Sequence, residues 1–457
     1  MSVWSTEIIQ RYGGPGPRYT SYPPAHCFHE EVTHQDYLEA LGAGNAERRP
    51  LSLYMHLPFC EHVCYYCACN RIVTGDKRLA APYLDTLLAE MAQKSALVDS
   101  QRPVVQIHWG GGTPTFLDDG QLTRLMHQTG RRFRLLDNDR GDYGIELDPR
   151  TVTRSRISLL RGLGFNRVSI GVQDLDARVQ QAVNRVQPYD RVREVVDAAR
   201  DFGFRSTSVD LIYGLPWQSE SSLARTVEQL LALRPDRISL YNYAHLPARF
   251  KVQRQISEAA LPAPMEKLRM LVRAGDLFAD AGYVFIGMDH FALPSDAMAM
   301  AQRAGTLHRN FQGYSLHGDA DLLGMGISAI SQIGALYAQN HRQIDTWQSA
   351  VQEGEMPVAQ GYVLDRDDQI RRDMIMSLLC HLEVDLTAFG ERWAIQTTDY
   401  FADELAALAT FERDGLVRRD GRRLHLTDGG RLAARAVAMC FDRYHSPADT
   451  VRFSRII

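Results

Sequence analysis

Between residues 51 and 241 the sequence repeats one unit, in which a short apolar segment is followed by a loop and then by a helical segment. Apolar segments of this kind, spaced by helices, indicate parallel strands whose two faces are both covered. Six units predict an α/β fold built on a partial (β/α)6 barrel, and the pattern alone leaves an open doubly wound sheet as the alternative. The expected strands are 51–55, 104–109, 144–147, 167–170, 206–212 and 237–241, with helices such as 81–92, 122–133, 191–202 and 223–233 between them.

Chemically distinctive residues follow the carboxyl end of every expected strand. Because these ends meet at one mouth of an α/β barrel, we expect the residues there to form a single site. A lone Gln or Asp in such a place is more often a helix cap, but six equivalent occurrences argue against that interpretation. In strand order the residues are the loop 60–69, the glycines 110–112 with Thr113 and Pro114, Glu146 and Asp148, Gln173 and Asp174, the segment 210–214, and the segment 242–245.

The loop after the first strand contains four of the seven cysteines, Cys60, Cys64, Cys67 and Cys69. Disulfide geometry disfavours bridges within so short a loop. Zinc sites usually join two separated pairs of ligands, whereas here three thiolates lie on one loop with no partner pair elsewhere. An iron–sulfur cluster suits this spacing, and three ligands on four irons would leave one iron open for a small molecule. Four buried structural thiols are the weaker alternative, because short motifs this rich in cysteine are rarely idle.

The spacing of Cys60, Cys64 and Cys67, with the aromatic Tyr66 before the third cysteine, resembles the signature of the radical S-adenosylmethionine (SAM) superfamily. Over nearly its full length the chain is similar to the oxygen-independent coproporphyrinogen III oxidases, also called coproporphyrinogen dehydrogenases. The similarity includes the segments 17–23, 287–291 and 308–313.

This resemblance implies an oxidoreductase of haem biosynthesis that converts coproporphyrinogen III to protoporphyrinogen IX by anaerobic oxidative decarboxylation of two propionates to vinyl groups. The implied cofactors are a [4Fe-4S] cluster on Cys60, Cys64 and Cys67 and two SAM molecules in adjacent sites. Cleavage of SAM would give a 5′-deoxyadenosyl radical that takes a hydrogen from a propionate β-carbon, after which the substrate radical loses CO2 and one electron. The implied partners are the substrate, an electron donor for the cluster and a terminal electron acceptor.

The resemblance also assigns site residues. Two assignments have a physical reason as well, since glycine lets a ligand approach the backbone and arginine binds a carboxylate in a bidentate way. The catalytic candidates are Tyr54 and Cys69, and for Cys69 a packed, inert thiol is the equal alternative. The first SAM molecule would contact Tyr54, Gly111, Glu146, Ala244 and Ile330, and the second Tyr66, Gly112, Thr113, Gln173, Arg185 and Asp210.

Three other functions are weighed against this one. A radical SAM haem chaperone generally lacks the segment 17–23 and the fourth cysteine, both of which are present here. A haem-degrading radical SAM methyltransferase on the same scaffold would yield methylated, ring-opened haem. A zinc-stabilised globular protein would be colourless, whereas a cluster protein would be brown.

Composition and charge indicate which kinds of binding partner and which compartment to expect. A formal net charge of −4 provides no basic field for nucleic acid. No apolar run is long enough to span a membrane and the start does not resemble a signal peptide, so no membrane association is expected. The odd, clustered cysteines predict a cytoplasmic protein. Only four of the 51 basic residues are lysine, for which genomic codon bias is a stronger explanation than carboxylate recognition.

Three domains are expected. Residues 1–50 form an N-terminal arm, extended and on the surface by composition, which the resemblance places near the substrate with Arg18 as a partner for a propionate. Residues 51–345 form the barrel, including a further strand at 283–288. Residues 346–457 form a mostly helical, winged-helix-like cap, with helices 369–380 and 400–411, a hairpin turn at Asp420-Gly421 and a last helix from Asp428. A large chain with its own arm and cap is expected to be a monomer.

Overall fold

Six parallel strands form the central sheet of the computed structural model, which describes residues 6–445. They lie side by side in chain order and all run in the same direction. A doubly wound sheet would reverse its strand order at a switch point, so the observed order excludes that alternative and confirms the partial (β/α)6 barrel. The strands are β1 (Leu51–Leu57), β4 (Pro103–Gly111), β6 (Asp142–Leu147), β7 (Arg167–Gln173), β8 (Ser206–Tyr213) and β9 (Arg237–Asn242).

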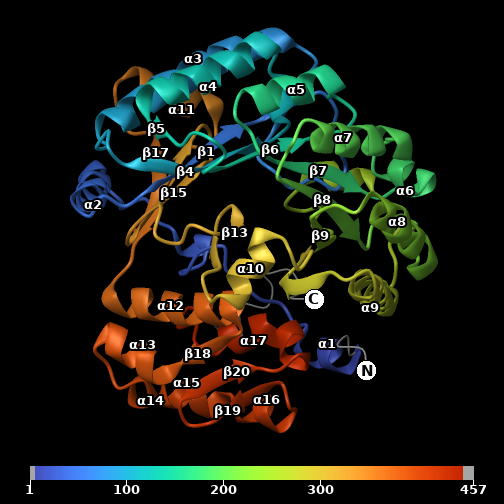
Figure 1. Ribbon diagram of the computed structural model, residues 1–457, viewed down its shortest axis with the longest axis vertical. Helices are drawn as coiled ribbons and strands as arrows, with labels where there is room; N and C mark the ends of the chain where they lie inside the picture. Colours follow the sequence, from blue (N-terminus) through green and yellow to red (C-terminus); the bar gives the residue numbers. More distant parts are fainter. Residues whose placement is uncertain (1–5, 446–457) are drawn as a thin grey trace.

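Helices cover the outer face of this sheet (Figure 1). Two of these helices begin with a capping box, formed by Asp118 and Gln121 at the start of α4 and by Ser219 and Ser222 at the start of α8. The apolar face of α7, with Val192, Val195 and Val196, is buried against the strands. The covering helices are α3 (Ala80–Ala96), α4 (Asp119–Arg132), α5 (Arg154–Gly162), α6 (Ala177–Ala182), α7 (Tyr189–Asp201), α8 (Glu220–Leu233) and α9 (Pro264–Asp280).

The barrel does not close on itself, because other strands extend the sheet at both edges. At one edge β1 pairs in parallel with β14, and three antiparallel strands follow. At the other edge β9 pairs with β11, which pairs with β10, the strand expected at 283–288. These strands are β14 (Asp321–Met325), β15 (Ile330–Ile333), β16 (Leu336–Asn340), β17 (Val358–Val363), β10 (Val284–Gly287) and β11 (His290–Ala292), with the short β5 (Arg134–Leu135) beside β4.

The hairpin of β12 (His308–Asn310) and β13 (Gly313–Ser315) leads into a segment that closes the amino end of the barrel. Ser315 donates to Oε1 of Gln106 at 3.1 Å, and His317 lies 3.0 Å from Oδ2 of Asp142. Gln106 and Asp142 stand near the starts of their strands, so the opposite, carboxyl end is left for the site. In Figure 1, β13 and α10 (Ala297–Arg303) lie between the barrel and the C-terminal helices.

The C-terminal module packs around its own core, which includes Met374, Leu378 and Phe401. Its three-stranded sheet and the turn at Gly421, where φ is +85°, confirm the expected hairpin. The expected helix 400–411 is wrong, because Phe401 leaves helical geometry to bury its ring and divides the segment into short helices. The elements are α12 (Arg366–His381), β18 (Glu383–Asp385), α13 (Leu386–Trp393), α14 (Thr397–Tyr400), α15 (Ala402–Ala407), α16 (Ala409–Arg413), β19 (Val417–Arg419), β20 (Arg423–Leu426) and α17 (Ala434–Met439).

The boundary expected at residue 345 stays a prediction. The two elements that follow it, α11 (Ile344–Gln352) and β17, still pack with the barrel, α11 through Trp347 in the barrel core and β17 as the edge of the large sheet. The C-terminal core begins at α12.

The N-terminal arm comprises α1 (Thr6–Tyr12), an extended stretch and α2 (His34–Ala46). The expectation of a surface arm is wrong for Tyr19 and Tyr22, which are 1% and 0% exposed and belong to the C-terminal core. The hydroxyl of Tyr19 donates to Oδ2 of Asp442 at 2.9 Å, and that of Tyr22 accepts from the backbone N–H of Arg443 at 3.1 Å. The arm is therefore tied to the last described residues of the chain.

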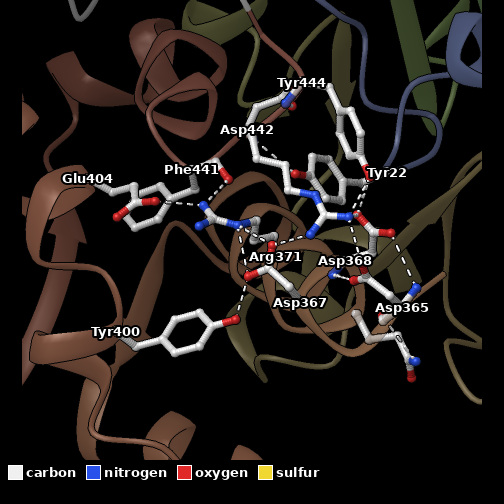
Figure 2. Close-up of polar contacts among 12 residues, drawn as sticks. Tyr22, Asp365, Asp367, Asp368, Arg371, Tyr400, Glu404, Phe441, Asp442 and Tyr444 are labelled. Carbon is white, nitrogen blue, oxygen red and sulfur yellow. Dashed lines mark hydrogen bonds and ion pairs between the residues drawn. The ribbon is translucent and has the colours of Figure 1, made fainter.

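Figure 2 shows the polar cluster that completes this junction at the start of α12. The guanidinium of Arg443 lies 2.8 Å from Asp365, 2.6 Å from Asp367 and 3.0 Å from Asp368. Tyr444 donates to Oδ1 of Asp368 at 2.8 Å. Three carboxylates at one helix start would repel one another. Arg443 contacts all three, and Arg371 also lies 2.9 Å from Asp367, so the two arginines hold the carboxylates together.

Among residues 6–445, no helix is both long enough and apolar enough to cross a bilayer.

Candidate active site

The cysteine loop leaves β1 and is fixed by its own backbone. The short strands β2 (Phe59–Cys60) and β3 (Ile72–Val73) pair across the loop, and the N–H of Thr74 donates to the carbonyl of Cys60 at 2.9 Å. Arg71 donates to the carbonyls of Cys67 and Cys69, at 3.2 Å in each case. All seven cysteines are free thiols. The loop thus presents its sulfurs from a defined backbone rather than from disulfide bridges.

Hydrogen-bond donors from two other loops of the barrel lie near two of these sulfurs. Thr113 lies 3.6 Å from Sγ of Cys60, and Arg185 lies 3.5 Å from Sγ of Cys64. The thiol of Cys69 donates to Cys67 and lowers the pKa of Cys67 to about 6, whereas burial raises the pKa of Cys60 to about 11. Donors aimed at sulfur stabilise a thiolate, which is the form that binds metal.

The loop faces a cavity of about 230 Å³ at the carboxyl ends of the barrel strands. Twelve of the residues expected from the sequence line it, so the strand-end pattern does converge on one place. They are Cys60, Cys64, Cys67, Cys69, Tyr66, Gly111, Gly112, Thr113, Glu146, Gln173, Arg185 and Asp210.

The glycines after β4 are required by close contacts. Gly111 has a φ of +110°, and a Cβ there would lie 2.6 Å from the ring of His56. A Cβ on Gly112 would lie 2.5 Å from the backbone of Pro58. Only glycine fits both positions, and the backbone therefore turns tightly into the cavity.

Two carboxylates stand in the cavity in different environments. Glu146 accepts hydrogen bonds from the N–H of Gly111 and from His108, both at 3.2 Å, and these donors hold its pKa below the usual value although burial opposes them. Burial raises the pKa of Asp210 to about 6, with the charge of Glu146 adding to the effect and the hydroxyl of Ser169 opposing it. Glu146 is therefore an anion at neutral pH, whereas the pKa of Asp210, about 6, lies closer to neutral pH.

Arg185 reaches the cavity with its guanidinium rather than capping a helix. It donates to the carbonyl of Gly171 at 2.6 Å and lies 3.2 Å from Asp148. Although burial opposes it, the charges of Tyr66, Asp148 and Cys64 hold the pKa of Arg185 above its usual value. Its Nε is buried and has no partner among the described residues. A buried guanidinium N–H without a partner indicates room for an acceptor supplied by a ligand.

Three expected residues lie outside this cavity. Tyr54 is bonded to His56 at 3.0 Å and stacks on His108. Ala244, just after β9, lines a second and mainly apolar cavity of about 620 Å³ between α1 and α9. Ile330 begins β15 and packs beside the cluster of Phe28 and Tyr337.

Sequence reasoning missed several residues of the site. His56 and His108 lie on β1 and β4, on the same faces as Tyr54 and at alternate positions, which is the signal that could have revealed them. The others, Arg71, Arg150 and Ser169, line the cavity or its edge. Cys69 is exposed and lines the cavity as well, and its role stays a prediction.

The donor set fits an iron–sulfur cluster with a small ligand beside it. Among residues 6–445, no three His, Cys, Asp or Glu side chains converge as the ligands of a single metal ion would. A cluster makes a different demand, because each iron takes its own thiolate. Three cysteines on one fixed loop, next to a glycine turn and the unpartnered Nε of Arg185, meet that demand and leave space for a ligand with a carboxylate.

Comparisons with known proteins agree with this geometry. The family model described as Radical SAM superfamily matches residues 54–230, and the one described as HemN C-terminal domain matches residues 364–433. The oxygen-independent coproporphyrinogen III oxidases of Pseudomonas aeruginosa and Escherichia coli are 50% and 46% identical to the chain, over 99% of its length and 99% and 98% of theirs. The solved structure of coproporphyrinogen III oxidase (HemN) from Escherichia coli, a radical SAM enzyme, has a TM-score of 0.91 at 44% identity and covers 97% of this chain and 99% of its own.

Proposed function

Because the chain belongs to the oxygen-independent coproporphyrinogen III oxidases, a family of radical SAM enzymes, we propose that it converts coproporphyrinogen III to protoporphyrinogen IX. In each of two rounds, a propionate loses a hydrogen atom from its β-carbon, then CO2 and one electron, and becomes a vinyl group. The observation that carries the proposal is that the three cysteines of one loop share a cavity with Glu146, Arg185 and Asp210.

The [4Fe-4S] cluster and SAM, when bound, supply the electron and the carbon radical that this reaction requires. Cys60, Cys64 and Cys67 would hold three of the four irons. Thr113 and Arg185 orient the sulfurs by hydrogen bonds from outside the loop. Cys69, exposed in the cavity beside Cys67, is the proposed catalytic or electron-relay thiol.

We further propose two adjacent SAM sites, supported by the two carboxylates. SAM carries an ammonium and a sulfonium, so each molecule needs an anionic partner. Glu146 on β6 and Asp210 on β8 stand two strands apart and provide one partner for each. Gly111 would serve the first molecule with Glu146, and the proposal for that molecule rests on these two residues since Tyr54, Ala244 and Ile330 lie outside the cavity.

The second SAM molecule would lie against Tyr66, Gly112, Thr113, Gln173, Arg185 and Asp210, which all line the cavity. The guanidinium of Arg185 suits its carboxylate. Gln173 has a φ of +67°, a strained conformation for a residue with a side chain, and such strain is concentrated at functional sites.

The activity is tested by incubating the anaerobically reconstituted protein with coproporphyrinogen III, SAM, dithionite and an electron acceptor. The expected products are CO2, 5′-deoxyadenosine and protoporphyrinogen IX, in a ratio of one 5′-deoxyadenosine to one vinyl group. Stable haem binding without decarboxylation would support a haem chaperone instead, and methylated, ring-opened haem a methyltransferase. Either result, or the absence of vinyl product, would contradict the proposal.

The number of SAM molecules is measured separately, by equilibrium dialysis of labelled SAM against the cluster-containing protein. We expect two molecules bound per chain and one in the Arg185→Met variant. A single molecule in the unchanged protein would contradict the two-site proposal and leave the decarboxylation proposal intact.

The electron donor, the terminal acceptor and the monomeric state stay predictions. Light scattering of the purified chain at several concentrations measures the last of these, and a mass twice that of the chain would contradict it.

A further inference from the structure

Three arginines from distant parts of the chain meet beside the barrel interior. Arg18 comes from the N-terminal arm, Arg309 from β12 and Arg435 from α17. Arg309 donates to the carbonyl of Arg18 at 3.3 Å. Burial and the positive charges of both arginines lower the pKa of Arg435. One carboxylate accompanies them, Asp289, whose Oδ2 lies 3.2 Å from Arg18. We call these four residues the arginine cluster.

Two members of the arginine cluster are buried without a counter-ion. Arg309 and Arg435 are 8% and 4% exposed, and Nε and Nη1 of each have no hydrogen-bond partner among residues 6–445. The other two buried arginines in that part of the chain are paired, Arg102 with Asp321 and Arg185 with Asp148. Buried charges are normally paired, so the two exceptions need an explanation.

The charges in the arginine cluster do not balance. Three guanidiniums face one carboxylate, which leaves an excess of two positive charges. Burial and the charge of Arg309 lower the pKa of the neighbouring His290 to about 4, so this ring is neutral and adds nothing at physiological pH. Burial also raises the pKa values of Tyr213 and Tyr314, which therefore stay protonated and cannot neutralise the arginines.

Packing alone does not account for this arrangement. Arg309 lies over the ring of Tyr314 at 5.0 Å, a contact that uses the face of the guanidinium and leaves its N–H groups free. Arg435 has no such ring among residues 6–445. Burial lowers its pKa to about 10, so the group is still a cation at neutral pH. A structural role would be better served by an apolar side chain of similar size.

The arginine cluster is next to the proposed active site. In addition to burial, charges on both sides shift the pKa of Tyr241 on β9. Asp210, which lines the cysteine cavity, and Asp289 of the arginine cluster raise it, and Arg18 of the arginine cluster lowers it. Tyr241 therefore lies within electrostatic reach of both the cysteine cavity and the arginine cluster.

We propose that Arg309 and Arg435, together with Arg18 as oriented by Asp289, bind those propionate carboxylates of the tetrapyrrole that are not at the reacting position. This inference rests on the function proposed above, and it assigns the residues that hold the substrate. Coproporphyrinogen III carries four propionates and its product keeps two. The two excess charges match the two carboxylates that remain throughout, and the guanidinium fork suits the carboxylate geometry.

The test measures binding of coproporphyrin III, the fluorescent oxidised form with all four carboxylates, to the cluster-containing full chain. Its tetramethyl ester, which has no charge, is the reference ligand. We expect Arg309→Gln and Arg435→Met each to raise the Kd for coproporphyrin III by about thirtyfold. The ester should bind the unchanged protein and both variants alike.

Matched variants separate charge from fold. Arg418, an exposed arginine of β19 in the same module, provides the control, and Arg418→Gln should leave the Kd for coproporphyrin III unchanged. Arg435→Lys keeps the charge without the fork and should restore part of the lost affinity. An equal loss of ester affinity in Arg309→Gln and Arg435→Met would mean a deformed pocket and would overturn the inference.

Thermal unfolding of the ligand-free protein provides a second readout. Because Arg435→Met removes an unpaired buried charge, the Tm of this variant should equal or exceed that of the unchanged protein. A clearly lower Tm with unaltered coproporphyrin III binding would show a structural arginine and overturn the inference.

The failure of this inference is distinguishable from that of the proposed function. If the unchanged protein produces vinyl groups while Arg309→Gln and Arg435→Met bind and decarboxylate the substrate as it does, only the arginine inference is wrong. If the unchanged protein produces no vinyl groups, the proposed function is wrong, and carboxylate-dependent binding lost in the variants would still support the arginine cluster as a carboxylate site.

Discussion

Glu146 and Asp210 are two carboxylates in the same cavity, and their neighbours give them different acidities. His108 and the N–H of Gly111 stabilise the anion of Glu146, whereas Asp210 is dominated by burial and by the charge of Glu146. The difference follows from single contacts, since the two strands that carry these residues are otherwise equivalent units of the barrel. One or two hydrogen-bond donors or charged neighbours therefore determine the protonation state of each carboxylate.

Asp210 makes SAM binding pH-dependent in our proposal. Burial, first, and Glu146, second, raise the pKa of Asp210 to about 6, so its anion forms as the pH rises through about 6. SAM affinity should increase over that range, and Asp210→Asn should remove the dependence and weaken binding about tenfold or more. Equilibrium titration with SAM at a series of pH values measures this, and an unchanged profile in the variant would exclude Asp210 as the titrating group.

The same group has the opposite effect on the stability of the ligand-free protein. A folded-state pKa above the ordinary aspartate value means that protonation favours the fold, so this contribution is lost as the pH rises through about 6.

Cys64 is expected to be indispensable for the cluster. It is buried, and both Arg185 and Arg150 point at its sulfur. Cys64→Ala should reduce iron and acid-labile sulfide to background, because a missing thiolate leaves one iron without its ligand. Cys440→Ser, outside the loop, should retain both and the brown colour. Full iron content in Cys64→Ala would remove Cys64 from the proposed ligand set.

At the scale of elements, the segment after the hairpin β12–β13 is held to the barrel by charge. His317 lies 3.0 Å and Arg167 2.7 Å from the carboxylate of Asp142 on β6. These contacts lower the pKa of Asp142 to about 2 although burial opposes them. They hold the segment at the amino end of the barrel, opposite the strand ends that carry the site.

This contact predicts an acid dependence of stability. Because the folded pKa of Asp142 is below its unfolded value, its contribution is present above about pH 4 and is lost as the pH falls towards about 2. Asp142→Asn should lower the free energy of unfolding at neutral pH by about 2 kcal/mol. Denaturant titrations at several pH values measure it, and a stability loss of equal size at neutral pH and at the acid end would contradict the assignment.

At the scale of the whole molecule, the N-terminal arm and the end of α17 are built into one junction with the C-terminal module. Tyr19 and Tyr22 fill the core of that module, and Arg443 gathers three aspartates at the start of α12 (Figure 2). The same junction brings Arg18 and Arg435 to the barrel interior. A closed surround of this kind suits radical chemistry, in which water and stray hydrogen donors must be kept out.

Arg443 should therefore stabilise the arm as well as the C-terminal module. Arg443→Met leaves three aspartates without their shared cation, and we expect a loss of about 2 kcal/mol, discounted because the side chain is 30% exposed. Thermal unfolding gives the loss, and limited proteolysis should cleave the arm faster. Arg418→Gln is the exposed control, and equal behaviour of the two variants would refute the junction as a stabilising contact.

The barrel and the cavity lining follow largely from local patterns in the chain. The spacing of apolar segments indicates all six strands, and residues directly after them, such as Gly111, Glu146 and Asp210, reach the cavity because parallel strands end at one edge. Local patterns are weaker where packing overrides propensity. Phe401 divides an expected helix because its ring is buried, and Tyr19 and Tyr22 leave an apparently exposed arm for a distant core.

The sequence by itself determined the repeating strand–helix units, the cysteine loop and the glycine turn, because each depends on spacing within a few residues. Only the tertiary structure decided which distant side chains meet. Arg18 and Arg309 are 291 residues apart in the chain, and Ala244 and Ile330 turned out to lie away from the cysteine cavity. Such contacts depend on how the arm, the hairpin and the C-terminal module close around the barrel, and no local spacing encodes that closure.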